Sequence, residues 1–521
     1  MSTTGATPFT SPDAPLLDRG AGDDPVRDGG DACPGALRLH RADDGALARI
    51  RLPGGVLDAA GADALARAAG ELGDGVLHLT SRGNVQLRGM RDGCGATLAR
   101  LLDGAGLLPS PRHERIRNVV ASPLSGLDGR GRADVGPWLR ELDGLLCAGG
   151  AVGALSGRFL FALDDGRGDV GALGADVTVT AAVEDGWALL RLGGGGGALR
   201  IRGERAARAA VTAAEVFLAA VREVALPGAP VQGAALPGAP VRDAALPGAP
   251  VREVPVRGAA VRDAAARGLW RVADLGGQED ALLREVALRL AALGAEAHEV
   301  PAPAVVPDPA DGPPPGVVPG PDPGRVALSV RAPLGLLTGA QWRALTDCAR
   351  ADGRGELRLT PWRGIVVPAV AAGRAADRLA ALAATGLVTG ADSPWWGVGA
   401  CAGRPGCAKS LADVRADATA LVALTPTGDR GRGALPVYWS GCGRGCGRPP
   451  GDRIDVVAES TGYRVDEVRA GRPRTRSRVD HSAGPGELAA AVRSARAPET
   501  PQGPAGADPA PCPPPTTPAD P

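Results

Sequence analysis

The chain lacks several features that would assign it to large classes of proteins. Its 521 residues carry 58 basic and 58 acidic side chains, so no overall field favours nucleic acid or an anionic membrane. No run approaches the roughly 18 uninterrupted apolar residues of a membrane-spanning helix, and the N-terminal stretch has no apolar core of signal-peptide length. We therefore expect a cytoplasmic protein that binds neither nucleic acid nor membrane.

Two cofactor-binding patterns are also missing. No G-x-G-x-x-G sequence opens a helix after a strand, so the chain has no dinucleotide-binding motif of its own. No spacing typical of a mononuclear iron site joins the five histidines, His40, His78, His113, His298 and His481. His78 is the histidine we would test, since it adjoins the polar turn LTSRGN.

Glycine and proline make up about a quarter of the chain, which indicates ordered domains separated by flexible segments. Residues 1–33 and 496–521 are too poor in apolar side chains to fold, and we expect disordered tails. Residues 223–265 contain the unit ALPGAPVRD repeated with a period of ten, which indicates a low-complexity insertion. Residues 301–324 are rich in proline and predict a linker.

A second repeat lies at long range. The stretches IRLPGGVL, LHLTSRG and AGLL recur as VRAPLGLL, LRLTPWRG and TGLV, each 280 positions later. Each copy alternates apolar and polar residues in the order strand, helix, strand, turn, strand, helix. We therefore predict an α+β fold with two similar units at 34–110 and 325–392, arranged as a pseudo-twofold pair. Their interface would bring the turn residues Arg82 and Arg363 near each other.

Four of the nine cysteines form two close pairs near the C-terminus: Cys401 with Cys407, and Cys442 with Cys446. Four thiolates complete a 4Fe-4S cluster. Structural zinc also takes four cysteines, but usually in pairs with two to four intervening residues, which C-x5-C exceeds. An iron-sulfur cluster is therefore favoured over zinc or a glycine-rich loop with incidental thiols. A pattern S-x-x-D from Ser410 predicts that a helix begins directly after the first pair.

These motifs, together with LTSRGNVQLRG and RNVVASPLSGLD, resemble those of the sulfite and nitrite reductase superfamily. The resemblance covers roughly residues 37–495 and implies ferredoxin-like half-domains together with α/β domains that hold a 4Fe-4S cluster. It assigns a first α/β substrate or cofactor domain to 111–222 and the 4Fe-4S-binding domain to 393–495. A helical segment is expected at 266–300.

Within the superfamily, the wording ACAGRPGCAKSLADVRADA and YWSGCGRGCGRP looks most like the precorrin-3B synthase family of aerobic cobalamin biosynthesis. That resemblance implies a monooxygenase that hydroxylates a tetrapyrrole, precorrin-3A, with dioxygen and then closes a gamma-lactone. NADH is implied as the indirect source of electrons, passed on by a separate reductase. Siroheme or a mononuclear non-haem iron is a further possible cofactor.

The resemblance also implies roles for individual residues. Cys401, Cys407, Cys442 and Cys446 match the cluster ligands. Arg82 and Arg158 match catalytic positions, the second of which is a lysine in the reductases. Residues expected to meet the tetrapyrrole and its carboxylates are Thr80, Asn84, Gln86, Arg88, Arg117, Asn118 and Arg363. Guanidinium groups suit this role because they pair with carboxylates through two parallel hydrogen bonds. Tyr438 stands where a histidine is expected.

Two other interpretations stay open at this point. The chain could be a siroheme-dependent sulfite or nitrite reductase, which would show a haem-like absorption spectrum and release sulfide or ammonia. It could also be a non-catalytic electron carrier or a zinc-stabilised scaffold, which would turn over no tetrapyrrole. The duplicated unit argues against a simple carrier, since a carrier needs far less chain.

Overall fold

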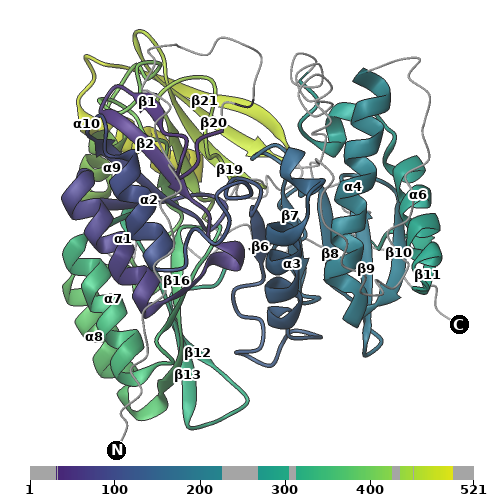
Figure 1. Cartoon of the computed structure of the whole chain (residues 1–521). Coiled ribbons are helices and arrows are strands. Elements are labelled where there is room, and N and C mark those ends of the chain that lie inside the picture. Colours follow the sequence, from purple (N-terminus) through teal and green to yellow (C-terminus); the bar gives the residue numbers. More distant parts are fainter. Residues whose placement is uncertain are drawn as a thin grey trace, which may run out of the picture.

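The computed structural model describes residues 31, 33–225, 268–303, 312–424, 434–449 and 451–496. The predicted tails at 1–33 and 496–521 and the repeat insertion at 223–265 lie almost entirely outside these residues. In Figure 1 the helices α1, α2, α7 and α8 line one side of the molecule, and two further domains cover the rest. No described helix combines the length and hydropathy that crossing a bilayer requires.

The duplicated unit predicted from the sequence is present as two α+β half-domains. The first consists of β1 (His40–Ala42), β2 (Gly45–Ile50), β3 (Val56–Asp58), α1 (Ala59–Leu72), β4 (Val76–Leu79), β5 (Val85–Met90) and α2 (Gly95–Gly104). The second consists of β12 (Gly316–Pro319), β13 (Arg325–Arg331), β14 (Leu336–Thr338), α7 (Gly339–Asp352), β15 (Glu356–Leu359), β16 (Gly364–Ala371) and α8 (Ala375–Ala384). The strand β12 falls inside the predicted linker at 301–324, because its backbone pairs with β13 despite the surrounding prolines.

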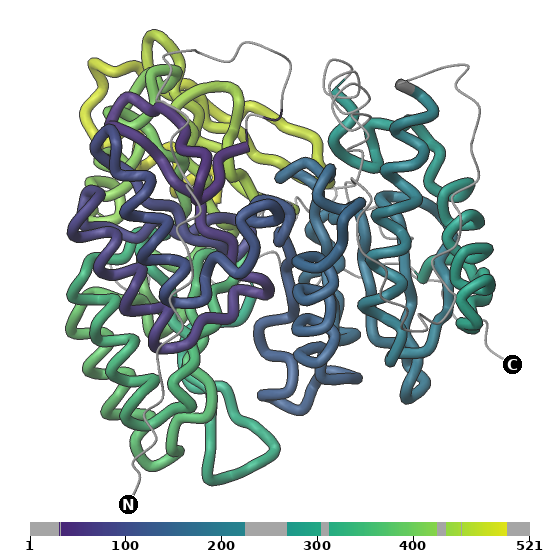
Figure 2. Tube along the Cα trace, in the orientation of Figure 1, coloured from purple at the N-terminus to yellow at the C-terminus, as the bar shows by residue number. Residues whose placement is uncertain are grey.

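The half-domains exchange one strand each. The first sheet has the order β1-β2-β5-β4-β14, and the second has the order β12-β13-β16-β15-β3. Each sheet therefore ends with a strand from the other half-domain. The pairing of β14 with β4 and of β15 with β3 holds the two half-domains together. Figure 2 shows the first half-domain in purple beside the second in green. The predicted pseudo-twofold arrangement of the half-domains is confirmed.

The two copies also share one hydrophobic core. The helices α1 and α7 pack together, and the indole N–H of Trp342 donates to the carbonyl of Ala62 at 2.8 Å. Each of these helices begins at an equivalent cap: the Asp58 carboxylate accepts from the Gly61 N–H, and the Thr338 hydroxyl accepts from the Gln341 N–H. Such caps satisfy backbone donors that the first turn of a helix leaves free.

The equivalent turns differ at one functional position. At the offset of 280, Arg363 matches Gly83 rather than Arg82, and Trp362 matches Arg82. Gly83 has φ 65°, and Arg363 adopts φ 59° at the same point of its turn. An L-residue with a large side chain rarely adopts this left-handed conformation, which is found mainly where a function requires it.

Each half-domain is joined to an α/β domain. The first contains β6 (Val119–Ala121), α3 (Gly136–Ala148), β7 (Phe161–Asp164), β8 (Val177–Ala181), β9 (Trp187–Leu192), β10 (Gly197–Arg202), α4 (Ala206–Ala225), α6 (Glu279–Ala292) and β11 (Ala297–Pro301). The second contains β17 (Val398–Ala400), α9 (Val414–Ala423), β18 (Val437–Ser440), β19 (Arg453–Ala458), β20 (Gly462–Arg469), β21 (Arg472–Asp480) and α10 (Pro485–Arg496).

The two α/β domains are also copies of one arrangement of strands, which the search for repeats within the sequence did not detect. The first sheet has the order β6-β7-β8-β9-β10 and continues to β11. The second has the order β17-β18-β19-β20-β21. In both, the first three strands run parallel and the rest antiparallel. The segment expected to be helical at 266–300 supplies α6 and β11 to the first of these domains, because β11 pairs with β10.

Candidate functional site

The four paired cysteines lie at one edge of the second α/β domain. Cys401 directly follows β17, and Cys442 and Cys446 lie in the loop after β18. Since β17 and β18 are parallel neighbours, their carboxyl ends meet at the same edge of the sheet. The N–H of Cys401 continues this pairing by donating to the carbonyl of Trp439 at 2.9 Å. The strand order thus joins parts of the chain that are far apart in sequence.

The four thiols influence one another electrostatically. Burial raises the pKa of the Cys446 thiol, Arg444 partly offsets this, and Cys401, Cys442 and Cys407 raise the pKa further. All four cysteines are free of disulfides. The N–H of Gly441 donates to the Sγ of Cys401 at 3.2 Å, a contact that favours a negatively charged sulfur. This donor set suits a metal centre held by thiolates.

The spacing of the sulfur atoms distinguishes between the metal centres. Tetrahedral zinc, with Zn–S bonds of about 2.3 Å, needs sulfur atoms only about 3.8 Å apart. Among the described residues, no three of these sulfur atoms lie within 4.8 Å of one another. A 4Fe-4S cluster places four irons between its ligands and therefore needs a wider arrangement. The four cysteines therefore do not form a ready-made tetrahedral zinc site, and four thiolates are also the ligand set of a 4Fe-4S cluster.

The helix predicted directly after the first pair begins later. The N-cap of α9 is Asp413, whose carboxylate accepts from the N–H of Ala416 at 3.1 Å. The hydroxyl of Ser410 instead donates to the carbonyl of Ala412. The prediction of a capping box from Ser410 is therefore wrong, and Cys407 lies in a loop rather than at a helix N-terminus.

A cavity of about 530 Å³ opens beside Cys401 and Cys446, between the first half-domain and the cysteine loops. Among the described residues, its wall includes seven arginines and no carboxylate. The arginines are Arg49, Arg51, Arg82, Arg88, Arg158, Arg363 and Arg415. Thr80, Ser81 and Gln86 line it as well, on the turn and strand that the sequence analysis singled out. We call this space the cluster cavity.

Five of these arginines form no ion pair with any carboxylate of the described residues. They are Arg49, Arg51, Arg82, Arg363 and Arg415. Arg51, Arg363 and Arg415 donate to backbone carbonyls, and Arg49 and Arg51 also donate to the side chain of Cys33. Burial, together with the neighbouring charges of Arg51 and Arg271, lowers the pKa of Arg82 to about 10. Neighbouring cations that disfavour one another's charge in this way make the cavity suited to an anion from outside the chain.

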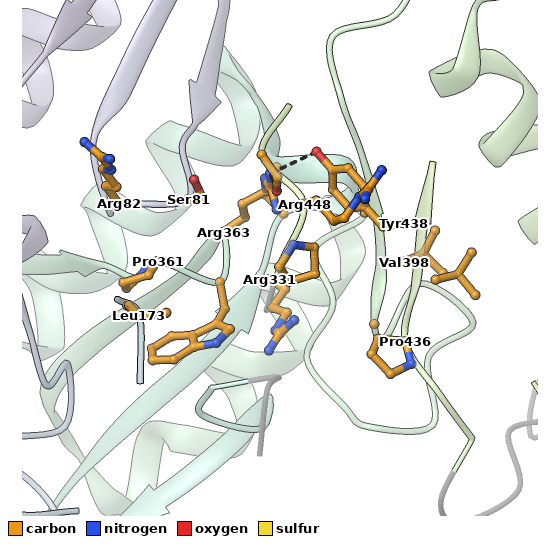
Figure 3. A pocket seen from close by; sticks show the side chains of 18 of the residues that line it. Ser81, Arg82, Leu173, Arg331, Pro361, Arg363, Val398, Pro436, Tyr438 and Arg448 are labelled. Carbon is orange, nitrogen blue, oxygen red and sulfur yellow. Dashed lines mark hydrogen bonds between the residues drawn. The ribbon is translucent and has the colours of Figure 1, made fainter. Parts of the chain in front are cut away.

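A smaller cavity of about 250 Å³ continues from the first and shares Arg82, Arg363 and Tyr438 with it. Figure 3 shows Arg363 between Arg82 and Tyr438. Its other walls combine three further arginines, Arg271, Arg331 and Arg448, with apolar and aromatic side chains: Leu160, Leu173, Pro361, Trp362, Val388, Trp395, Val398, Pro436 and Val437. Both cavities therefore carry cationic side chains, and the smaller one adds the indole rings of Trp362 and Trp395.

Tyr438 connects these cavities to the cysteine loop. Its hydroxyl donates to the carbonyl of Cys446 at 2.6 Å, and burial raises its pKa to about 12. Arg363 donates to the carbonyl of Gly447 at 2.9 Å and lies 3.5 Å from the same hydroxyl. At Gly447, φ is 77°, a left-handed conformation that favours glycine, and a Cβ would lie 2.9 Å from Arg363 Nη2. The uncommon backbone of Arg363 thus allows it to reach the loop.

Three of the residues predicted to meet the tetrapyrrole do not line the cluster cavity. Asn84 is buried and accepts from the Leu52 N–H at 2.8 Å, so it fixes the turn. Asn118 accepts from Arg51 at 3.1 Å and therefore orients that cation. Arg117 forms a two-pronged ion pair with Asp143 and faces a separate cavity.

The sequence analysis missed several residues that the structure places in the wall. Arg49 and Arg51 lie at the end of β2, and Arg415 comes from α9. A signal for Arg51 was present, because it and Arg331 occupy the same position in the repeated stretches IRLPGGVL and VRAPLGLL. No comparable sequence signal marks Arg415, which reaches the cavity through the packing of the second α/β domain on the first half-domain.

His78 lies in the wall with a defined tautomer. Its Nε2 is 2.9 Å from Asp74 Oδ2, so Nε2 carries the hydrogen and Nδ1 presents a lone pair. Nδ1 is 3.5 Å from Arg415 Nη1, and Arg415 also donates to the carbonyl of Cys401 at 3.1 Å. Burial lowers the pKa of His78, with Arg415 and Arg88 adding to the effect and Asp74 opposing it, so the imidazole is neutral near pH 7.

Comparisons with known proteins agree with this geometry. The family described as the nitrite/sulfite reductase ferredoxin-like half domain matches residues 39–102 and again 318–385. A precorrin-3B synthase of Sinorhizobium is 26% identical over 436 residues, covering 83% of this chain and 81% of the relative. A ferredoxin–nitrite reductase of Synechococcus elongatus is 30% identical over 147 residues, which is 27% of this chain and 29% of the relative. The solved NirA protein of Mycobacterium tuberculosis covers 86% of this chain and 79% of its own, with a TM-score of 0.63 and 20% identity, so it shows the shared fold.

Proposed function

Since the chain belongs to the sulfite and nitrite reductase superfamily, we propose that it is a monooxygenase of the precorrin-3B synthase type. The observation that carries this proposal is the cluster cavity, whose wall holds seven arginines beside Cys401 and Cys446, five of them without an ion pair among the described residues. A precorrin carries acetate and propionate groups around its macrocycle, and these can pair with guanidinium groups in forked geometry. The similarity to the Sinorhizobium enzyme extends over most of both chains.

The side chains of the cavity have distinct roles in this proposal. Arg49, Arg51 and Arg82 bind the rim carboxylates, and Trp362 and Trp395 cover the apolar face of the macrocycle. Cys401, Cys407, Cys442 and Cys446 hold the cluster, which supplies electrons one at a time when bound. Arg158 is a charge-pairing group at the mouth, since a guanidinium does not release protons. A separate reductase delivers the electrons from NADH.

The proposed reaction has a definite balance. One oxygen atom of dioxygen is bonded to the meso carbon of the tetrapyrrole and the other leaves as water, which consumes two electrons and two protons.

The test is anaerobic purification with iron and sulfide analysis, followed by incubation with precorrin-3A, a reductant and labelled dioxygen. Mass spectrometry then shows whether the product carries the label. Unlabelled product, or no turnover by protein with a full iron content, contradicts the monooxygenase.

The similarity to the Synechococcus reductase supports a second candidate, a siroheme-dependent nitrite or sulfite reductase. The same cavity could hold the polycarboxylate rim of a haem-like cofactor instead of a substrate. The purified protein distinguishes the two. A haem-like absorption spectrum together with ammonia or sulfide release supports the reductase, whereas the spectrum of a cluster alone excludes it.

A further inference from the structure

The loop around Cys407 is held from outside its own domain. Arg88, on β5 of the first half-domain, donates to the carbonyl of Gly406. The carboxylate of Asp43, in the turn between β1 and β2, accepts from the N–H of Ala408. The residues on both sides of Cys407 are therefore fixed by side chains that lie more than 300 positions earlier in the chain.

A third side chain, Asp44, fixes Arg88. Asp44 accepts from Arg88 through both carboxylate oxygens, at 2.7 and 2.9 Å, and only 6% of the Arg88 side chain is exposed. A Cβ on Gly406 would lie 2.8 Å from both Arg88 Nη2 and Asp44 Oδ2, so the loop approaches the pair as closely as a glycine allows. Forked pairs of this kind hold their geometry better than single contacts.

The duplicated half-domain offers an internal comparison. The positions that match Asp43, Asp44 and Arg88 in the second copy are Pro323, Gly324 and Pro368. The strand register confirms the match, since Leu87 pairs with Ala48 and Val367 with Leu328 in the same arrangement. The fold therefore does not require these three side chains, and they occur only in the copy that faces a cysteine loop.

We propose that Asp43, Asp44 and Arg88 are positioning residues that hold the loop of Cys407 so that its sulfur faces the other three cysteines. This inference rests on the proposed role of these cysteines as cluster ligands. It assigns Arg88 to the loop rather than to the tetrapyrrole. Because β5 also presents Gln86 to the cluster cavity, one strand fixes both the wall of the cavity and this loop.

The test measures the loop in the full-length chain before any cluster is assembled. Reduced, metal-free protein is treated with iodoacetamide, and mass spectrometry gives the alkylation rate of Cys407 relative to Cys442 in the same molecules. The double variant Asp43→Ala/Asp44→Ala should raise this ratio at least several-fold, because the loop is released while the second loop is untouched. Arg88→Lys, which keeps the charge and loses the forked contact, should raise it less.

The matched control is Asp92→Ala, which removes an exposed carboxylate from the same half-domain and should leave the ratio unchanged. After cluster assembly, a chelator should extract iron several-fold faster from the double variant than from the control. A ratio equal to the wild-type value in both test variants overturns the proposal, provided that circular dichroism shows them folded. If the double variant unfolds, Arg88→Lys decides by the same ratio. Neither measurement uses the tetrapyrrole, so failure of the proposed reaction gives a separate result.

Discussion

The two α/β domains place different chemistry at the same edge of the same kind of sheet. In the first domain, Ser122 follows β6, and Asp164 and Asp165 lie at the end of β7. In the second, Cys401 follows β17, and Cys442 lies just beyond β18. The shared strand order shows that the scaffold provides an edge where separate loops meet, and that the residues on those loops decide what the edge binds.

The carboxylate edge is satisfied by the protein itself. Oxygens of Asp164, Asp165 and Asp169 lie within 4.8 Å of one another. Arg167 pairs with Asp165 at 2.7 Å and with Asp128 at 2.9 Å, and three backbone N–H groups donate to Asp164. Burial lowers the pKa of Arg167, but the hydrogen bonds and charges of Asp165 and Asp128 outweigh this effect, so the pKa is raised overall. The paired cysteines of the other domain have no comparable network among the described residues, since the contact given to one of their sulfur atoms is the Gly441 N–H on Cys401.

The cavities next to the two sheet edges differ in whether their charged side chains balance. Gly54 and Ala121 line a cavity of about 440 Å³, at positions that correspond to Leu334 and Ala400 in the cluster cavity. Its charged residues balance, with four arginines and four carboxylates: Arg51, Arg117, Arg140, Arg358, Asp58, Asp134, Asp143 and Glu356. The cluster cavity has an excess of positive charge. Uncompensated charge, rather than the fold, therefore distinguishes the half of the duplicated structure that holds the paired cysteines.

Loss of one cysteine should have the largest effect. Replacing Cys401 with serine removes a ligand whose backbone is fixed by β17 and β18, so the iron content should fall from about four atoms per chain to near zero. Iron and sulfide are measured after anaerobic assembly. Cys94→Ser is the matched control, because Cys94 lies in the first half-domain away from the edge. Full iron in the Cys401 variant would show that these four cysteines do not hold one cluster.

Replacing a cavity arginine should have the next largest effect. Arg82→Met should weaken binding of a polycarboxylate porphyrin by about 10- to 100-fold, the equivalent of one charge-assisted hydrogen bond. The melting temperature should not fall, because burial and the neighbouring cations already disfavour the charge of Arg82. Fluorescence quenching gives the affinity.

The balanced cavity provides the control for this experiment. Arg140 lines it and is exposed, so Arg140→Met should change porphyrin affinity less than twofold. Equal losses in the two variants would mean that binding follows overall charge, and the comparison between the cavities would no longer hold.

The sequence predicted the half-domains well because the repeat at an offset of 280 preserves both apolar periodicity and turns. It did not predict the exchange of β3 and β14, since pairing between strands of different units leaves no local pattern. The duplication of the α/β domains was not predicted from the sequence for a different reason. Their shared strand order is carried by different residues, such as Asp165 and Gly441 at equivalent positions of the sheet edge.

Local motifs identified the site only in part. The turn LTSRGN marked Thr80 and Arg82, and the structure places both in the wall of the cluster cavity. The segment RNVVASP led to Arg117, but a residue pair distant in sequence decides its position, because Asp143 on α3 holds its guanidinium. Long side chains such as arginine can turn to either side of a strand end, so a motif cannot specify which cavity they face.

The carboxylate edge allows a test with a smaller effect. Burial, together with Asp164 and Asp165, raises the pKa of Asp169 from 3.8 to about 7. Between these values the native carboxyl keeps a proton that the unfolded chain releases, so its contribution to stability is complete below pH 4 and declines as pH rises to 7.

Asp169→Asn cannot ionise, and its Oδ1 can still accept from the Ser122 hydroxyl. The variant should therefore gain stability relative to wild type between pH 5 and pH 8, by a few kcal/mol at most. Thermal unfolding at both pH values measures this change, and the exposed Asp185→Asn should show none. An equal difference between Asp169→Asn and wild type at both pH values would mean that Asp169 does not change its protonation state between pH 5 and pH 8. In that case Asp169 would not titrate as its burial beside Asp164 and Asp165 predicts, and the contrast with the cysteine edge would have to be drawn from ligand type alone.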